Sequence, residues 1–282
     1  MAIDEARSTY RGADGTEIAA YRWSPTGPPR AVIQLAHGAG EHSGRYREPL
    51  APLVEAGYLV WSADHRGHGA TAPSPEALGD FGPGGATAAI DDMAVLSRRI
   101  RDEHPGLPLV LLGHSMGARF VQVYLAEHHA LVDAVVLSGT AAAWLPRDGR
   151  GPNAAYTAPR TDYDWLSRDE AEVDRYVADP WCGIRFTADT QASLARTSER
   201  LADPGAYDAV RRDLPIYVLV GDEDPVNAGL TRLTPLLDRF RDQGFTDVTL
   251  RVYPGGRHEM LNETNRDEVV ADLRAWLDRV VG

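Results

Sequence analysis

The chain has 282 residues, of which 43% are hydrophobic, so it can bury a large core as one α/β domain or as a core with an insertion. Its formal net charge of −12 argues against nucleic acid or an anionic membrane as a partner, because an acidic surface repels phosphate groups. The single cysteine, Cys182, excludes a disulfide within these residues and suits a cytoplasmic location, and we expect it to be buried as a small apolar side chain.

The N-terminal segment gives no indication of a targeting or membrane-anchoring element. Its first fifteen residues lack a basic region followed by an apolar one, and no apolar run in the chain is long enough to cross a bilayer. We therefore expect no stable membrane insertion. The sequence leaves the oligomeric state open.

The first predicted elements form an antiparallel hairpin followed by a buried strand. Asp14-Gly15 is a strong two-residue turn signal, so residues 16–23 should pair with the stretch before the turn. Residues 31–36 are short and continuously apolar, as expected of a strand buried on both faces. The hairpin is therefore predicted at an edge of the sheet.

Helices and strands then alternate from residue 46 to residue 137. A helix over 46–56 is indicated by the spacing of Leu50, Leu53 and Val54, despite Pro49 near its start. The series is helix 46–56, strand 58–63, helix 85–104, strand 109–112, helix 116–129 and strand 132–137. This alternation predicts a mostly parallel sheet with helices on both faces.

The alternation stops at residues 140–207 and resumes after them. The later elements are strand 216–220, helix 230–240, strand 248–253 and helix 267–280. Residues 140–207 contain no clear strand and scatter aromatic residues among charges, so we predict a core of residues 1–139 and 208–282 with an inserted cap at 140–207. An independent second domain is the weaker alternative, because this segment is too short and too polar to bury a core alone.

A serine lies in a glycine-flanked pattern between a predicted strand and a predicted helix. Gly113-His114-Ser115-Met116-Gly117 matches GxSxG, in which a strained turn presents the serine hydroxyl at the carboxyl end of the sheet. The glycines allow neighbouring backbone to approach closely. Ser115 is therefore the predicted nucleophile, and the alternative is a glycine-rich turn whose serine only caps the helix.

The base that activates a serine hydroxyl is normally a histidine that follows the serine and the acid in this arrangement. Of the nine histidines, only His128, His129 and His258 follow Ser115. The first two lie at the far end of the predicted helix, about 20 Å away. His258 follows strand 248–253 and should reach the same edge of the sheet, so we predict it as the general base, with a solvated loop histidine as the alternative.

The acid that orients the histidine should follow strand 216–220, where Asp222, Glu223 and Asp224 compete. We prefer Asp224, because the two residues before it are suited to turning the chain and Pro225 stiffens the loop after it. The spacing leaves Asp222 as a rival. A cation site formed by the three acids is less favoured than a turn.

Catalysis also requires hydrogen-bond donors for a developing oxyanion, and two backbone N–H groups are suitable. One belongs to Met116, directly after the predicted nucleophile, and the other to Ala39, in a glycine-rich turn after the first parallel strand. The alternative for that segment is a plain turn. From the same loop, we expect Gly38, Glu41 and His42 to contact the substrate.

A metal site is not favoured, and no cofactor is expected. Asp64, His65 and His68 lie close together, but no further ligand is nearby in the sequence, so we expect a hydrogen-bonded loop scaffold. Three further histidines should line or support the predicted site and not bind metal: His37, His42 and His114.

Five motifs in order carry a resemblance to a known family. They are HGAGEHSGRY (37–46), DHRGHG (64–69), GHSMG (113–117), GDEDPV (221–226) and YPGGRHEMLNE (253–263). Together they resemble the monoacylglycerol lipase and lysophospholipase branch of the α/β-hydrolases, of serine aminopeptidase type, and the likeness extends into SRDEAEVDRYVADPWC (167–182). The resemblance implies the α/β-hydrolase fold, Asp224 as the triad acid, and Ala39 with Met116 as the oxyanion pair.

The predicted function is hydrolysis of a small-molecule carboxylic ester, of monoacylglycerol or lysophospholipid type, through an acyl-enzyme on Ser115. Residues 140–166 lack the apolar helix that lipases of this branch carry, which predicts short or soluble esters over long-chain monoglycerides. An amidase, aminopeptidase, thioesterase or lactonase of the same fold is an open alternative, because the triad is shared. Ser115 disfavours chemistry that uses a carboxylate nucleophile. A non-catalytic ligand-binding protein is the alternative from another class.

Overall fold

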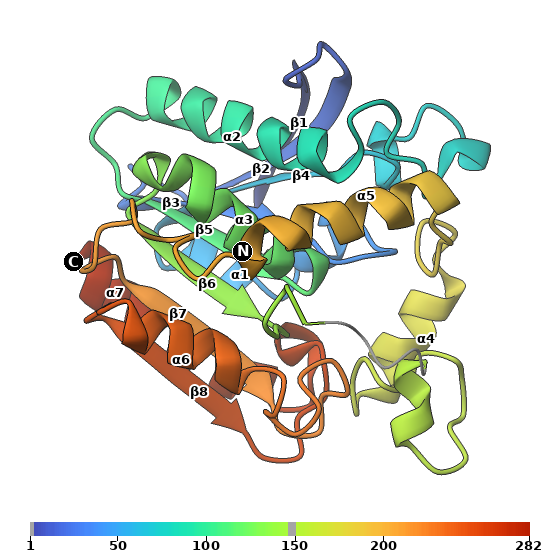
Figure 1. The fold of residues 1–282 in the computed structure, drawn as a ribbon. Coiled ribbons are helices and arrows are strands. Elements are labelled where there is room, and N and C mark those ends of the chain that lie inside the picture. The colour runs from blue at the N-terminus through green and yellow to red at the C-terminus, as the bar shows by residue number, and fades with distance from the viewer. Residues whose placement is uncertain (1–2, 146–150) are drawn as a thin grey trace.

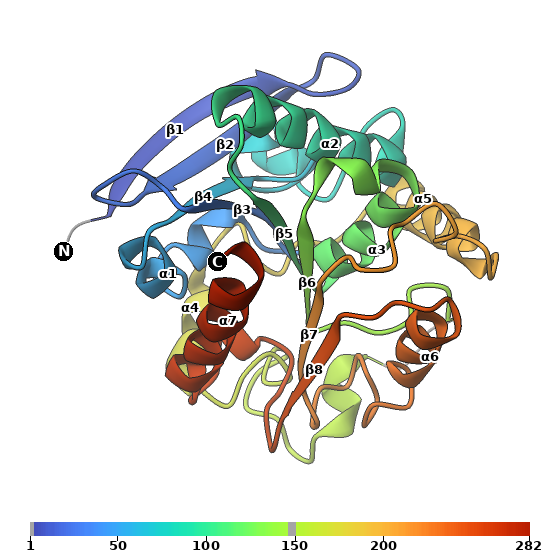
Figure 2. The ribbon, with the colours of Figure 1, turned by 90° about the vertical axis from the view of Figure 1, so that its left-hand side faces the viewer.

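A computed structural model describes residues 3–145 and 151–282, and the described residues are organised around one eight-stranded sheet (Figure 1, Figure 2). The strands are β1 Asp4–Arg11, β2 Glu17–Ser24, β3 Ala31–Ala36, β4 Tyr58–Ala63, β5 Leu109–His114, β6 Ala134–Ser138, β7 Ile216–Gly221 and β8 Val248–Tyr253. Their order is β1-β2-β4-β3-β5-β6-β7-β8, with β2 antiparallel to β1 and β4 and all other pairs parallel. The predicted α/β-hydrolase fold with its N-terminal hairpin is confirmed.

Helices cover both faces of the sheet (Figure 2). On one face lie α1 Ala51–Glu55 and α7 Arg266–Val281, and on the other lie α2 Gly85–Glu103, α3 Met116–His128 and α6 Thr234–Asp242. Because successive side chains of a strand point to opposite faces, Val32 and Ile33 of β3 enter two different hydrophobic clusters. Each face therefore has its own core, and the fully buried parallel strands separate the two.

The helix predicted over 46–56 is wrong in length. The structure has a 3-10 helix at Ser43–Tyr46 and only the five-residue α1 farther on. Pro52 stands at the start of α1, where a missing N–H costs nothing, but a proline inside a longer helix would remove a hydrogen bond and clash with the preceding turn. The apolar spacing predicted the buried face of this segment but not its length.

Several other predicted boundaries also differ from the structure by one or more residues; β5, for example, extends to His114 and not only to residue 112. The helix predicted to begin at residue 230 begins at Thr234, because Leu230 has a φ of +69°, which no α-helix accommodates. The strand predicted over 132–137 is β6, which starts two residues later and includes Ser138. In this longer strand, Ser138 pairs with His114 at the end of β5.

Between β6 and β7 the described residues form helices and loops but no strand. This segment contains α4 Glu170–Ala178 and α5 Ala188–Glu199. Helix α5 packs against α2 and α3, whereas α4 lies beyond the end toward which the arrows of β6 and β8 point (Figure 1). The segment therefore stands over the edge of the sheet at which the parallel strands end.

Candidate active site

Ser115 occupies the turn between β5 and α3 in a strained conformation. Its φ of 53° and ψ of −112° lie in a region that residues other than glycine rarely adopt. A Cβ on Gly113 would lie 2.5 Å from the carbonyl oxygen of Gly117. The N–H of Ser115 donates to the carbonyl of Ser138 at 2.9 Å, which fixes the turn to β6.

Two cavities meet at Ser115. The larger has a volume of about 800 Å³ and is lined mostly by apolar side chains, many of them from the loop after β6, together with Met116 and a mixed polar and apolar face of α5. The smaller has a volume of about 200 Å³ and is lined by polar and aromatic side chains, including His258. Ser115, Ala39 and Val226 line both. A ligand that spans the two cavities would therefore contact Ser115.

His258 and Asp224 form a buried pair. Nδ1 of His258 lies 3.0 Å from Oδ2 of Asp224, and neither side chain is more than 1% exposed. The other carboxylate oxygen accepts the N–H of Val226 at 2.8 Å. With Nδ1 donating to Asp224, Nε2 is the basic nitrogen, and it is buried without a hydrogen-bond partner among the described residues. No hydrogen bond joins it to Ser115 there, although both residues line the smaller cavity.

Asp222, the rival acid, has a different position. Its side chain is exposed, and Oδ1 accepts the N–H of Gly255 at 2.7 Å. Asp222 thus holds the loop that leads to His258 without reaching the imidazole. The structure therefore brings Asp224, and not Asp222, to His258.

The glycine-rich turn after β3 leaves one N–H without a partner. The N–H of Gly38 donates to Oε1 of Glu41 at 2.5 Å, and the N–H of Gly40 donates to Nε2 of His68 at 3.2 Å. Between them, Ala39 is exposed to both cavities, and within the described residues its N–H makes no hydrogen bond. Met116 is the first residue of α3, so its N–H also lacks an acceptor within the helix.

The residues predicted to contact substrate lie in two different environments. Gly38 and Glu41 line the smaller cavity, but both oxygens of Glu41 already accept hydrogen bonds from the protein. His42 lines neither cavity. Its Nε2 lies 2.9 Å from Oδ2 of Asp179, and its ring packs edge-on against Trp181 with the centroids 5.2 Å apart.

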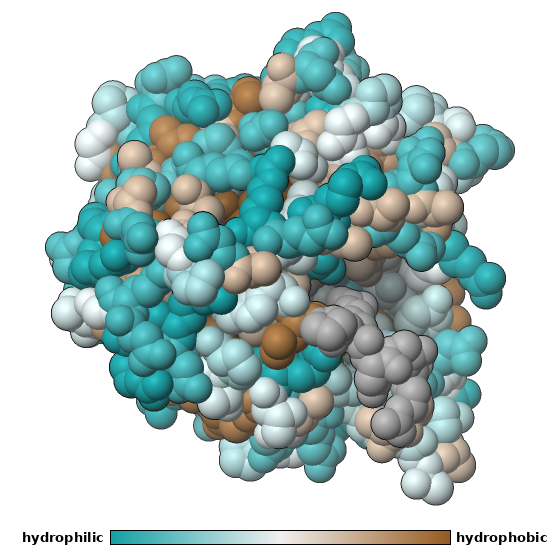
Figure 3. All heavy atoms as spheres, viewed as in Figure 1, coloured by the Kyte–Doolittle hydropathy of each residue, from teal (hydrophilic) through white to brown (hydrophobic). Residues whose placement is uncertain are grey.

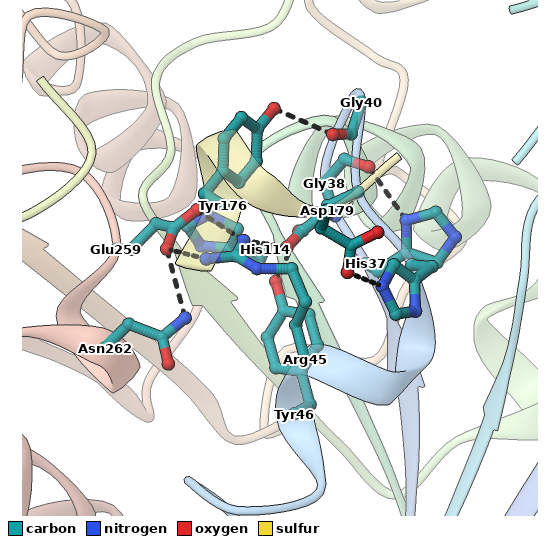
Figure 4. Close-up of polar contacts among 12 residues, drawn as sticks. His37, Gly38, Gly40, Arg45, Tyr46, His114, Tyr176, Asp179, Glu259 and Asn262 are labelled. Atoms are coloured by element: carbon teal, nitrogen blue, oxygen red, sulfur yellow. Dashed lines mark hydrogen bonds and ion pairs between the residues drawn. The ribbon is translucent and has the colours of Figure 1, made fainter. Parts of the chain in front are cut away.

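A buried charge network beside the site was missed from the sequence (Figure 4). Nη1 and Nη2 of Arg45 each lie 2.7 Å from an oxygen of Glu259, and Nη1 also lies 2.6 Å from Oε2 of Glu41. Burial raises the pKa of Glu259, but the adjacent charge of Arg45 outweighs it and lowers that pKa to about 2. Arg45 and Glu259 lie in two of the motifs that carry the family resemblance, but nothing in either motif identifies the other residue as its partner.

Three buried histidines lie under the glycine-rich turn and remain neutral. Burial lowers the pKa of His37 to about 4 and that of His68 to about 3, and it also lowers the pKa of His65. Nε2 of His37 accepts the N–H of His65 at 2.9 Å, and Nδ1 of His68 donates to the carbonyl of Arg66 at 2.9 Å. These contacts form the hydrogen-bonded scaffold that the sequence predicts for this segment.

Two groups of described side chains come close enough to share a metal ion: His42, Asp179 and Cys182, and Asp91, Glu127 and His128. In the first group, Nδ1 of His42 accepts the N–H of Gly44 at 3.2 Å, so Nε2 carries the proton that a metal ion would displace. Burial raises the pKa of the Cys182 thiol, which opposes formation of a thiolate ligand. Cys182 is half-buried, which differs from the expectation of a buried apolar side chain.

The chain is similar to known ester hydrolases over almost its whole length. The family described as serine aminopeptidase, S33, matches residues 27–265. The chain is 34% identical to the monoacylglycerol lipase of Mycolicibacterium smegmatis, over 95% of each chain, and 29% identical to the monoglyceride lipase of Homo sapiens, over 95% of this chain and 88% of that one. A crystal structure of a highly thermostable carboxyl esterase from Bacillus coagulans superposes with a TM-score of 0.90, at 26% identity and full coverage of both chains.

Proposed function

The chain belongs to the serine aminopeptidase, S33, family and is a serine hydrolase of the α/β-hydrolase fold, and on that premise we propose that it cleaves carboxylic esters through an acyl-enzyme on Ser115. One observation carries the proposal. The imidazole of His258 is fixed by Asp224, and its Nε2 has no partner in the described part of the chain and lies in a cavity that Ser115 also lines. An unpaired, buried basic nitrogen next to a serine on a strained turn is suited to removing the hydroxyl proton.

In the proposed reaction, Nε2 of His258 takes the proton of Ser115 while the serine oxygen attacks the ester carbonyl. Asp224 stabilises the imidazolium that forms. The tetrahedral oxyanion accepts hydrogen bonds from the N–H groups of Ala39 and Met116. His258 then gives its proton to the leaving alcohol, and water hydrolyses the acyl-enzyme by the same route. The hydrogen bond between Ser115 and His258 is expected to form in the substrate complex, where such contacts tighten.

We propose that residues 140–207 form a cap on a core of residues 1–139 and 208–282. The described part of this segment supports that division, because it contributes lining to both cavities. It also contacts the two loops of the site: the N–H of Gly183 donates to the carbonyl of Gly40 at 2.9 Å, and the N–H of Glu259 donates to that of Leu166 at 2.7 Å. Substrate selection would then reside in the cap.

Short or soluble esters are the proposed substrates, and two observations support this choice. The described part of 140–166 contains only one short 3-10 helix, Pro152–Ala155. Residues 146–150, which belong to the segment predicted to lack an apolar helix, lie outside the described residues. Hydrophilic side chains cover most of the face in Figure 3, and hydrophobic ones appear there as small scattered patches. A surface of this kind gives little apolar area for resting on lipid. Among the described helices, none has the length and apolarity to span a membrane.

The volume of the larger cavity limits how long a bound acyl chain can be, but it does not exclude short chains. Its volume of about 800 Å³ is near the top of the range for small-molecule sites, so it accepts chains well beyond acetyl. We therefore propose monoacyl esters that remain dispersed in water as the best substrates, including monoacylglycerols of moderate chain length.

The test combines covalent labelling with an ester and amide panel. Wild type, Ser115→Ala and Ser198→Ala are treated with a fluorophosphonate and analysed by mass spectrometry. Ser198 is a matched control, because it lines the same larger cavity. We expect one adduct on Ser115 in the wild type and in Ser198→Ala, none in Ser115→Ala, and ester turnover only where the adduct forms. Labelling elsewhere, or no labelling, would contradict the proposed nucleophile, and faster amide than ester turnover would contradict the proposed reaction.

A further inference from the structure

The backbone around Ala39 is fixed by side chains that hold its neighbours Gly38 and Gly40. The N–H of Gly38 donates to Glu41, and the carbonyl of Gly40 accepts the hydroxyl of Tyr176 at 2.7 Å (Figure 4). The carbonyl of Gly38, which shares a peptide group with the Ala39 N–H, accepts Nδ1–H of His37 at 2.8 Å. The direction of the proposed oxyanion donor therefore depends on His37, which holds its peptide group, and on the Glu41 carboxylate, which holds the peptide group before it.

The Glu41 carboxylate is in turn held by Arg45, whose guanidinium also reaches the loop of the proposed base. Arg45 binds both oxygens of Glu259 and one oxygen of Glu41, and the three side chains are at most 10% exposed. Glu259 directly follows His258 in the chain. The guanidinium also lies over the ring of Tyr176, 4.8 Å from its centroid. A planar fork with several donors can make these contacts together, whereas a lysine ammonium cannot.

We propose that Arg45 is a positioning residue for the reaction, which sets the Ala39 donor through Glu41 and the His258 base through Glu259, and whose charge offsets the two carboxylates beside His258. The inference rests on the proposed function, since it requires His258 to act as the base. Arg45 itself touches no reacting atom. It fixes the distance between the Ala39 N–H and the His258 imidazole, which do.

The charges around His258 make this inference testable by pH. The titratable and charged groups come from four elements: Asp224 after β7, the neutral His114 at the end of β5 with its ring centroid 4.8 Å away, Glu259 in the same loop, and Glu41 with Arg45 after β3. Glu41 and Glu259 line the smaller cavity together with His258. The network has one positive and two negative charges. Removing Arg45 leaves two carboxylates without a counter-charge, which favours the imidazolium, whereas removing the charge of Glu259 disfavours it. The two changes should move the pH profile in opposite directions.

The experiment measures kcat, KM and the pH dependence of kcat/KM on a soluble ester for Arg45→Met, Arg45→Lys and Glu259→Gln. For Arg45→Met we expect kcat to fall about 100-fold, the effect of misplacing one oxyanion donor, with KM changed much less. Its acid limb should move to higher pH, and that of Glu259→Gln to lower pH. Arg45→Lys keeps the charge but not the fork, so it should restore the acid limb and leave kcat reduced.

Arg168→Met is the matched control. Arg168 forms an ion pair at 2.9 Å with the buried Glu263, which also joins the proposed cap to the loop after His258, but this pair does not contact the turn at Ala39. We expect its kcat and its acid limb to stay close to those of the wild type. Thermal unfolding of each variant separates misfolding from mispositioning, and Arg45→Lys with Glu259→Gln preserve the test if Arg45→Met does not fold.

Three outcomes would overturn the inference: an unchanged kcat in folded Arg45→Met, an equal loss in Arg168→Met, or acid limbs that move in the same direction or not at all. Failure of the proposed function is distinguished in the same preparation. If the wild type is not labelled on Ser115, the mechanism itself is wrong, whereas normal labelling with unaltered Arg45 variants contradicts only the positioning role.

Discussion

Nδ1 of His258 lies 3.0 Å from Oδ2 of Asp224, with both side chains buried. This contact fixes the tautomer of the imidazole, because the nitrogen that donates to the carboxylate carries the proton and the other nitrogen is left basic. Asp222 lies only two positions earlier in the chain but uses its carboxylate to hold Gly255. The two acids can therefore be separated by mutation.

Asp224→Asn is expected to lower kcat by about 10⁴-fold, because an amide that donates to Nδ1 selects the wrong tautomer of His258, as in a trypsin-type triad. Asp222→Asn should retain most of the activity, since its acceptor oxygen for Gly255 is preserved. Steady-state kinetics on a soluble ester compares the two. Equal losses in both variants would contradict the assignment of the acid.

Gly38→Ala should impair catalysis without preventing folding. An added Cβ would lie 2.6 Å from Oε1 of Glu41 and 3.2 Å from Cβ of Ser115, so the turn must shift and carry the Ala39 donor with it. We expect kcat to fall about 10²- to 10³-fold, the loss measured when one oxyanion donor is removed. Gly27→Ala is the control, because a Cβ there meets nothing within 4 Å. Full activity of folded Gly38→Ala would count against Ala39 as a donor.

Stability should decrease in mild acid because of the buried neutral histidines. Burial lowers the pKa of His37 and His114 to about 4 and that of His68 to about 3. An unfolded histidine has a pKa near 6.5, so below about pH 6.5 only the unfolded chain takes up these protons, and unfolding becomes easier until the folded values are reached. At about pH 5 each such histidine should cost roughly 2 kcal/mol relative to neutral pH.

Urea unfolding at several pH values tests this dependence. His68→Gln provides the comparison, because an amide oxygen can still accept the N–H of Gly40 but does not titrate. Its unfolding free energy should fall less between about pH 7 and about pH 5 than that of the wild type. The same slope in both proteins would show that His68 is not held neutral.

A series of p-nitrophenyl esters tests the proposed preference for dispersed substrates. The rate should be greatest for short to moderate acyl chains, because the face shown in Figure 3 offers little apolar area for binding aggregates. Adding detergent micelles or vesicles should not activate the enzyme. A clear maximum at long acyl chains, or activation by a lipid surface, would contradict the proposal.

The edge of the sheet at which the site lies follows from the sequence. Parallel strands end at the same edge, and the turn or loop after each of β5, β7 and β8 carries one predicted residue: Ser115, Asp224 and His258. Short apolar runs, glycine turns and chain order predicted this edge for Ser115 and His258, whereas the choice of Asp224 over Asp222 was settled by the family resemblance. Apolar spacing was less informative for residues 46–56, where the prolines decide how far a helix extends.

Contacts between distant segments did not follow from the sequence. Arg45 and Glu259 are 214 positions apart, and nothing in their local patterns selects one partner over the many other acids and bases of the chain. His42 was expected to contact the substrate, but it lines neither cavity and its Nε2 lies 2.9 Å from Oδ2 of Asp179, the residue that follows α4. Such pairings depend on how loops pack in three dimensions, which periodicity does not encode.

The segment between β6 and β7 is bonded to both loops of the site, at Gly40 and at Glu259. Exchanging this segment for that of a relative would therefore disturb bond cleavage as well as selectivity. Engineering of new specificity is better confined to single side chains that face only the larger cavity, such as Trp144 and Leu194. Changes there alter the shape available to the acyl group while leaving both anchoring contacts in place.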